Sequence, residues 1–183
     1  MSAFMNLHFS WMMKLNSSDV IAIFAGVIAF FSMVATVWQG IISRKHNRLS
    51  VRPHIDFGVN CFYGKPVTLN IRNFGAGVAF VKNIDIVFEG VKYKVEGASM
   101  PSPIKDAIER NFRNVNFSLC DGGSPIESGG EMTMLYFLDA ENNIDVFKEA
   151  REFLKKFKIT MIYESIYKER FSAYLDVASL VGS

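Results

Sequence analysis

The chain has 183 residues, of which 50% are hydrophobic and 17 are Phe, and its formal net charge is only +2. So weak a charge argues against bulk binding to nucleic acid, which requires a strongly basic surface. The two cysteines, Cys61 and Cys120, match no metal-binding or redox spacing. We therefore expect two small, buried, free thiols instead of a disulfide framework.

Residues 1–19 form a short segment ahead of the first long apolar run. Bulky apolar side chains crowd residues 4–15, but this stretch is too short to cross a bilayer. It either lies flat in the membrane interface as an amphipathic segment or lengthens the helix that follows. Residues 16–19, Asn-Ser-Ser-Asp, offer hydroxyl and carboxylate caps for the N-terminus of that helix.

The 23 residues from Val20 to Ile42 carry no charge. A helix of this length is ~35 Å long, enough to cross a hydrocarbon core with a slight tilt. Trp38 stands near its C-terminal end, where an indole favours the lipid headgroup region. The pattern predicts one transmembrane helix at residues 20–42. A cleaved signal peptide is the alternative, but it would have a shorter apolar run and a more basic start.

The flanks of this run predict the orientation of the helix. Its C-terminal flank carries four cations, whereas Lys14 is the one basic side chain before it. The four are Arg44, Lys45, Arg48 and Arg52. Positive flanks stay in the cytoplasm, so we expect the N-terminus outside and the domain in the cytoplasm. Residues 43–53 are then a basic juxtamembrane linker whose cations contact anionic headgroups.

Small residues recur along the apolar run at helical spacing. They are Ala22, Gly26, Ala29, Thr36 and Gly40. Their spacing places them on one face of a helix, where small side chains let two helices approach closely. This face predicts a homo-oligomer, either a bundle or a pore. The alternative is that Ala and Gly are simply common in membrane helices.

Residues 54–183 have the pattern of one mainly β domain. Alternating apolar residues between Gly- and Pro-rich turns predict strands at 55–59, 67–71, 80–88, 91–95, 116–120, 131–138, 158–164 and 170–176. Two short helices are expected, one from a Ser102 cap to about Phe112 and one capped by Asn142 or Asn143. The pattern favours an immunoglobulin-like β-sandwich with two short helices, and a small β-barrel is the alternative.

The domain has no recognisable catalytic motif. The histidines have no partner at metal-ligand spacing, and no glycine loop carries the Lys-Ser/Thr pair of a nucleotide-binding loop. We therefore expect no enzyme activity, no metal and no cofactor.

A group of basic and aromatic residues in the domain has two explanations. One is a basic, aromatic-lined recess for a nucleotide or phosphate. The other is a solvated charged surface. The basic residues are Lys92, Lys94, Lys105, Arg110 and Arg113, and the aromatic ones are Tyr93 and Tyr167.

Three stretches carry a resemblance to known proteins: the join from Trp38 to Pro53, residues 69–77 and residues 163–167. They resemble a widespread group of bacterial single-pass membrane proteins. In that group an uncharged helix runs through a basic His-Asn-x-Leu-Ser-x-x-Pro join into a cytosolic β-sandwich. The overall plan is also similar to effectors of bacterial anti-phage defence that damage the inner membrane when triggered. The resemblance implies a cytosolic β-sandwich anchored in a bacterial inner membrane, and it defines no active site.

Two functions of different classes follow from these expectations. In the first, the protein is an effector or sensor: the cytosolic domain binds a partner protein or a nucleotide signal, and the helices oligomerise and perturb the bilayer. In the second, it is a non-enzymatic anchor or scaffold that holds a cytosolic complex through exposed strand edges and loops. The effector function is favoured by the polar side chains inside the apolar run, which are Ser32, Thr36 and Gln39.

Overall fold

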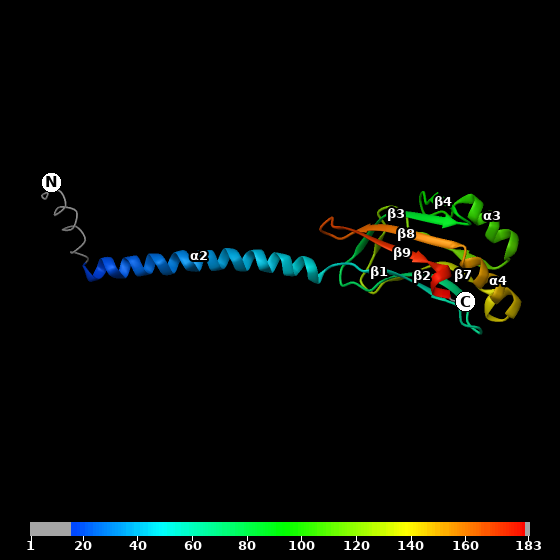
Figure 1. Cartoon of the computed structure of the whole chain (residues 1–183), viewed down its shortest axis with the longest axis horizontal. Coiled ribbons are helices and arrows are strands. Elements are labelled where there is room, and N and C mark those ends of the chain that lie inside the picture. Colours follow the sequence, from blue (N-terminus) through cyan, green and yellow to red (C-terminus); the bar gives the residue numbers. More distant parts are fainter. Residues whose placement is uncertain (1–15, 182–183) are drawn as a thin grey trace. The chain divides into compact units, whose positions relative to one another are not determined.

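The computed structural model describes residues 16–181, so the predicted interfacial segment at residues 4–15 lies outside the described residues. The chain divides into two compact units, Met1–Asn47 and Arg48–Ser183. The first contains most of one long helix, and the second contains all the strands (Figure 1).

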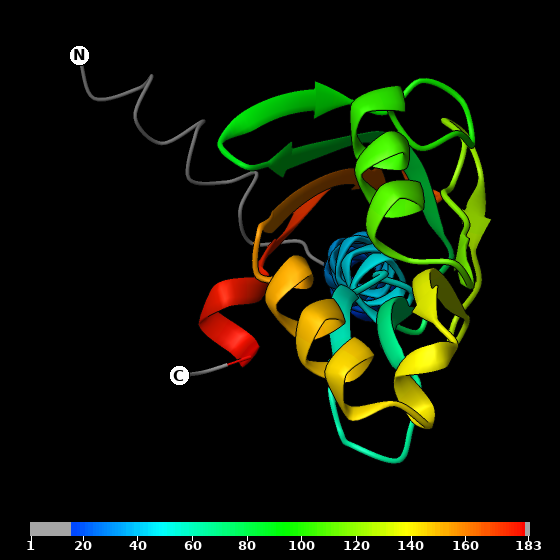
Figure 2. The ribbon, with the colours of Figure 1, turned by 90° about the vertical axis from the view of Figure 1, so that its right-hand side faces the viewer.

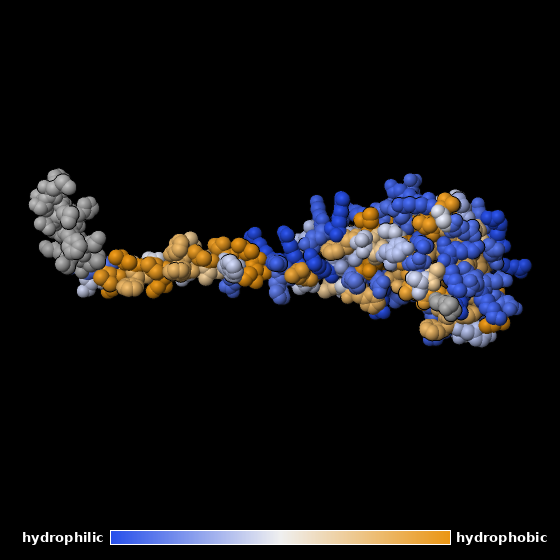
Figure 3. Space-filling view, viewed as in Figure 1, coloured by the Kyte–Doolittle hydropathy of each residue, from blue (hydrophilic) through white to orange (hydrophobic). Residues whose placement is uncertain are grey.

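Helix α2 spans Ser17–Ser50 and is long and apolar enough to cross a membrane. Its N-terminus is capped as the sequence predicts, because the Asp19 carboxylate accepts a hydrogen bond of 3.1 Å from the Asn16 amide. None of the helix residues is buried; apolar side chains cover most of its surface, and hydrophilic ones follow toward its C-terminal end (Figure 3).

The helix does not end near Ile42, where the apolar run ends, but continues through the basic residues to Ser50. Arginine, lysine and leucine are good helix formers, and no proline interrupts the chain before Pro53. The segment predicted as a linker, residues 43–53, is therefore mostly helical.

After Pro53 the chain is mainly β, as predicted, and forms two antiparallel sheets (Figure 1). The first has the order β1-β2-β7-β5, from Ile55–Asn60, Val67–Asn73, Glu131–Phe137 and Val115–Phe117. The second has the order β4-β3-β8-β9, from Val91–Lys94, Ala79–Phe88, Phe157–Glu164 and Arg170–Asp176. A two-residue strand, β6 (Pro125–Ile126), pairs with β3 and has no counterpart in the sequence prediction.

Two helices lie together at the end of the sheets away from Pro53 (Figure 2). They are α3 (Ser102–Asn111) and α4 (Ile144–Leu154), and both were expected. Asn143 caps α4, and its side chain accepts hydrogen bonds from the amides of Asp145 and Val146. The expected Ser102 cap is wrong: Pro101 holds the cap position of α3, and its carbonyl accepts from Ile104 and Lys105.

Two short helical elements were not predicted: a 3₁₀ turn, η1, at Asp139–Glu141, and helix α5 at Val177–Val181. Each spans five residues or fewer, which is too short for a helical period to show in the sequence.

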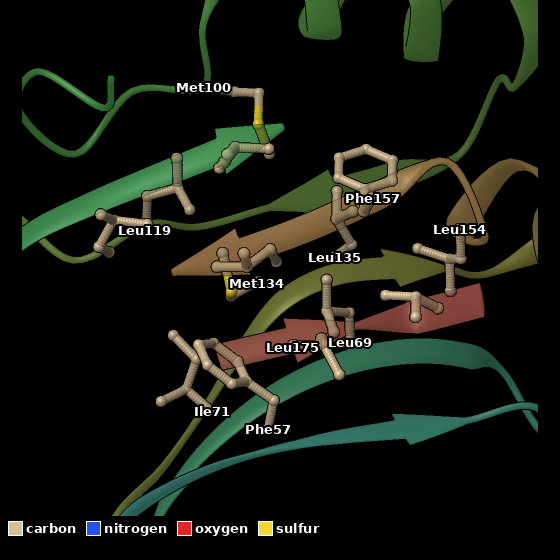
Figure 4. Packing of buried hydrophobic residues seen from close by; sticks show 14 of the residues in the cluster. Phe57, Leu69, Ile71, Met100, Leu119, Met134, Leu135, Leu154, Phe157 and Leu175 are labelled. Carbon is tan, nitrogen blue, oxygen red and sulfur yellow. The ribbon is translucent and has the colours of Figure 1, made fainter. Parts of the chain in front are cut away.

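Buried side chains from both sheets and from α3 and α4 form one hydrophobic cluster (Figure 4). Five of the phenylalanine rings pack against one another in this cluster, in edge-to-face or tilted pairs with centroid distances of 4.9–6.3 Å, which explains part of the phenylalanine surplus. They belong to Phe88, Phe112, Phe137, Phe153 and Phe157. The two cysteines are free thiols, Cys120 buried and Cys61 half-buried.

Candidate functional site

The candidate site is the end of the domain at which the chain enters from α2. Three segments meet there: the entry segment (Arg48–His54), the β2–β3 loop (Asn73–Gly77) and the β8–β9 turn (Ser165–Glu169). We call this region the entry surface. It lies wholly within the second unit of the chain.

Asn73, at the end of β2, holds the entry surface together and is fully buried. Its side-chain oxygen accepts hydrogen bonds of 3.0 Å from the amides of His54 and Gly75. Its side-chain nitrogen donates to the carbonyls of Gly77, at 2.7 Å, and Ile126, at 3.0 Å. The side-chain amide of Asn73 therefore links the entry segment, the β2–β3 loop and strand β6. Its oxygen and its nitrogen are both paired, as buried polar atoms usually are.

The glycines of the β2–β3 loop are explained by close approach of backbone to backbone. A Cβ on Gly75 would overlap the backbone of Arg52, Pro53 and His54, and a Cβ on Gly77 would overlap Val51. Ser128 strengthens the contact by donating to the Gly75 carbonyl at 2.8 Å. The stretch Asn-Phe-Gly-Ala-Gly at residues 73–77 thus serves to seat the entry segment.

The β8–β9 turn is fixed by the buried hydroxyl of Ser165, which accepts from the amides of Tyr167 at 3.2 Å and Glu169 at 3.3 Å. Lys168 adopts a left-handed backbone with a φ of 60°, which completes the tight turn. The turn therefore presents Ile166 and Tyr167 on a rigid tip, and both side chains are exposed.

Two of the predicted headgroup cations lie on the entry segment beside aromatic rings. The guanidinium of Arg48 lies 5.5 Å from the centre of the Tyr167 ring, and that of Arg52 lies 5.6 Å from Phe171. Arg52 also forms an ion pair of 3.5 Å with Glu169. The other predicted headgroup residues, Trp38, Arg44 and Lys45, are exposed on α2.

The predicted packing residues all lie on α2 and are exposed: Ala22, Gly26, Ala29, Thr36 and Gly40. At 3.6 residues per turn they share an arc of about 80° of the helix surface. Thr36 donates its hydroxyl to the carbonyl of Ser32 at 2.8 Å, so its polar group is satisfied within the helix. An added Cβ at Gly26 or Gly40 would meet no atom within 4 Å, so this face is open.

The structure distributes the predicted basic ligand residues over different elements. Lys92 and Lys94 lie on β4, and Lys92 pairs with Asp85 at 2.9 Å. Arg110 lies on α3 and donates to the Asp106 carbonyl at 3.1 Å. Lys94 lines a hollow of about 370 Å³ beside β3, whereas Arg113 lines a different hollow of about 190 Å³ beside Phe137. A shared nucleotide recess stays a prediction.

The outer face of the sheet containing β4, β3, β8 and β9 carries a set of ion pairs. Besides Lys92–Asp85, Lys158 pairs with Asp176 at 2.8 Å. Glu164 pairs with Lys82 at 3.2 Å and with Arg170 at 3.0 Å. These contacts tie together cations and carboxylates from neighbouring strands.

The ion pairs shift the pKa values of the carboxyl groups. Burial opposes ionisation of Asp85, but hydrogen bonds from Lys92 and Asn83 outweigh it and place its pKa below the usual value of 3.8. The hydrogen bond from Arg170 lowers the pKa of Glu164, and the one from Lys158 lowers that of Asp176. Burial raises the pKa of both thiols, which keeps them protonated and weakly nucleophilic at neutral pH.

These pKa shifts predict that the domain loses stability in acid. A carboxyl whose pKa is lowered by folding stabilises the fold above its ordinary pKa, and this contribution disappears as the pH falls through the folded value. We expect the urea midpoint of the full-length protein in detergent, followed by near-ultraviolet circular dichroism, to fall from pH 7 to pH 3. Asp85→Asn should lower the midpoint at pH 7 and show a smaller fall in acid. An equal or larger fall in this variant would contradict the assignment.

Several residues of the entry surface were not singled out from the sequence: Arg72, Asn73, Phe74, Ser165 and Ile166. Their signal was present, because residues 69–77 and 163–167 are two of the stretches that carry the resemblance to single-pass membrane proteins. Sequence alone does not reveal that both stretches contact the join.

A comparison with curated proteins found no match. A comparison with protein families found one whose model matches residues 11–180 and is described as a domain of unknown function, DUF8453. The match begins ahead of α2 and ends within α5, so the apolar helix and the β-domain are parts of the same family unit. Because it covers nearly the whole chain, the protein belongs to the DUF8453 family.

Proposed function

We propose that this protein is a membrane-anchored effector or sensor of the bacterial inner membrane, with its N-terminus outside and its β-domain in the cytoplasm. The domain binds a partner protein or a nucleotide signal, and the helices then assemble through their small-residue face and perturb the bilayer. Its domain architecture resembles that of membrane-damaging effectors, and this similarity suggests anti-phage defence as the biological process. The protein acts by binding and assembly and is not an enzyme.

The observation that carries this proposal is the complete exposure of α2. The helix has 34 residues and none of them is buried. An apolar helix of this kind needs lipid around it, and the open face at Gly26 and Gly40 offers a surface on which a second helix can pack. Basic residues from Arg44 to Arg52 favour the cytoplasmic side for the domain.

We further infer that the β-domain is a sandwich of immunoglobulin-like connectivity. The strand orders β1-β2-β7-β5 and β4-β3-β8-β9 correspond to the A-B-E-D and C′-C-F-G orders of that class. In a small barrel the end strands β1 and β9 would pair, whereas among the described strands each stands at the end of its own sheet. The strand order thus favours the sandwich over the small barrel.

The proposed partner surface lies at the other end of the domain from Pro53. The loop between β1 and β2 exposes Phe62, at 71%, and Tyr63, and the Tyr63 ring packs edge-to-face on Phe147 of α4 at 5.8 Å. Exposed aromatic side chains supported from beneath are typical anchors of protein interfaces.

The alternative function, a passive anchor or scaffold, is favoured by a free sheet edge. Strand β4 ends the second sheet, so in the described part of the chain one of its edges has no hydrogen-bonded neighbour. Strand β9 ends the sheet on the other side, but β1 lies beside it. A partner peptide can add to the free edge of β4 through backbone hydrogen bonds.

Membrane potential separates the two functions. We expect wild-type protein, expressed in bacteria with a potential-sensitive dye, to depolarise the inner membrane, and we expect Gly26→Leu/Ala29→Leu to abolish the effect and reduce the oligomer mass in detergent. Ala35→Leu is the matched control, because Ala35 lies on the opposite face of the helix. Equal depolarisation by all three proteins would reject assembly through this face, and no depolarisation by any of them would favour the scaffold.

A further inference from the structure

We propose that the entry surface is a second membrane-binding site, which rests on anionic lipid and places Phe74, Ile166 and Tyr167 in the headgroup region. This inference goes beyond the proposed function and holds for the effector and the scaffold alike. It requires only that residues 20–42 span the bilayer.

The first argument is the clustering of apolar side chains from distant parts of the sequence. Phe74 is 61% exposed, Ile166 is 65% exposed and Tyr167 is 47% exposed. Their two loops are brought to the same end of the domain because both contact the entry segment, through Gly75 on Arg52 and through Glu169 on Arg52. Single exposed apolar residues are ordinary, but a group on neighbouring rigid loops marks an interaction surface.

The second argument is the charge around these side chains. Arg72 holds its guanidinium 4.9 Å from the centre of the Phe74 ring, and Arg48 lies over Tyr167. Lys168 is exposed beside Tyr167 on the same turn. Aromatic rings next to arginine and lysine are the composition that binds the interface of an anionic membrane.

Three of the acidic groups nearby are engaged within the protein, whereas Asp56 lies opposite Arg72 in the pairing of β1 with β2. Glu169 pairs with Arg52 at 3.5 Å, and Glu131 accepts a hydrogen bond of 2.8 Å from Asn70. Glu164 is held between Lys82 and Arg170. Among the described residues neither Arg72 nor Lys168 forms an ion pair, so both cations are available to lipid phosphates.

The third argument is the length of the chain between the span and the domain. Arg48 follows Ile42 by six residues, and six residues reach at most ~22 Å even when fully extended. The entry surface contains Arg48, so it cannot lie far from the lipid headgroups. A separate folded protein would have little room there, which favours lipid as the occupant.

Tryptophan quenching in nanodiscs tests the proposal. Trp11 and Trp38 are changed to Phe in the full-length protein, and Ile166→Trp then provides the one reporter. One chain is placed in each nanodisc, made either of phosphatidylcholine or of phosphatidylcholine with phosphatidylglycerol, with and without bromine on the upper acyl chain. We expect brominated lipid to lower the emission at least twofold in the anionic discs and little in the neutral discs.

Phe62→Trp in the same background is the matched control, because Phe62 is an equally exposed apolar residue at the far end of the domain. It should not be quenched in either disc. Arg72→Glu/Lys168→Glu should remove the quenching of Trp at position 166 while leaving the near-ultraviolet circular dichroism unchanged. Unquenched emission at position 166 in the anionic discs would overturn the proposal, and so would equal quenching at both positions or in both lipids.

Discussion

Replacing Asn73 with Ala is expected to destabilise the β-domain by roughly 4 kcal/mol, because each buried polar group left without a partner costs about 1–3 kcal/mol. Four groups lose this partner: the buried carbonyls of Gly77 and Ile126 and the part-buried amides of His54 and Gly75. A loss of this size is a large part of the stability of an ordinary domain. Urea unfolding of the full-length protein in detergent, followed by near-ultraviolet circular dichroism, measures it.

Asn70→Ala is the matched control, since Asn70 lies on the same strand and makes an exposed hydrogen bond to Glu131. We expect this variant to lose less than about 1 kcal/mol. Asn73→Asp should remain destabilised, because a carboxylate can accept from His54 and Gly75 but cannot donate to the two carbonyls. Similar losses for Asn70→Ala and Asn73→Ala would show that Asn73 is not the central contact of the entry surface.

The elements of this fold could be predicted largely from local signals. Alternation between Gly- and Pro-rich turns located all the longer strands, and Asn143 marked the start of α4. The signals that failed were short or ambiguous. Strand β6 has two residues, and α3 has adjacent Pro101, Ser102 and Pro103, of which more than one can occupy a cap position.

The candidate site was less predictable because its contacts join residues that are distant in sequence. The partners of Asn73 lie at positions 54, 75, 77 and 126, and only the folded chain brings them together. The alternation of β4 correctly places Lys92 and Lys94 on one face. The pairing of Lys92 with Asp85 depends in addition on the register of β3 against β4, which no local pattern encodes.

Phe30→Arg/Phe31→Arg is expected to remove the protein from the membrane. Both side chains are exposed near the middle of the 20–42 run, where each arginine costs about 3 kcal/mol on insertion. Wild-type protein should stay in the pellet after extraction with alkaline carbonate, whereas most of the variant should appear in the supernatant. Phe30→Leu/Phe31→Leu is the matched control and should stay in the pellet, because leucine keeps the run apolar.

This experiment also separates the two membrane contacts of the protein. If the entry surface alone held the protein on the bilayer, the double arginine variant would still sediment at neutral pH in low salt and leave the membrane in high salt, because contacts between cations and phosphates are screened. Retention of the variant after alkaline carbonate extraction would mean that α2 is not the anchor. The helix would then need another explanation for its exposed apolar surface, and the orientation inferred from Arg44 to Arg52 would lose its basis.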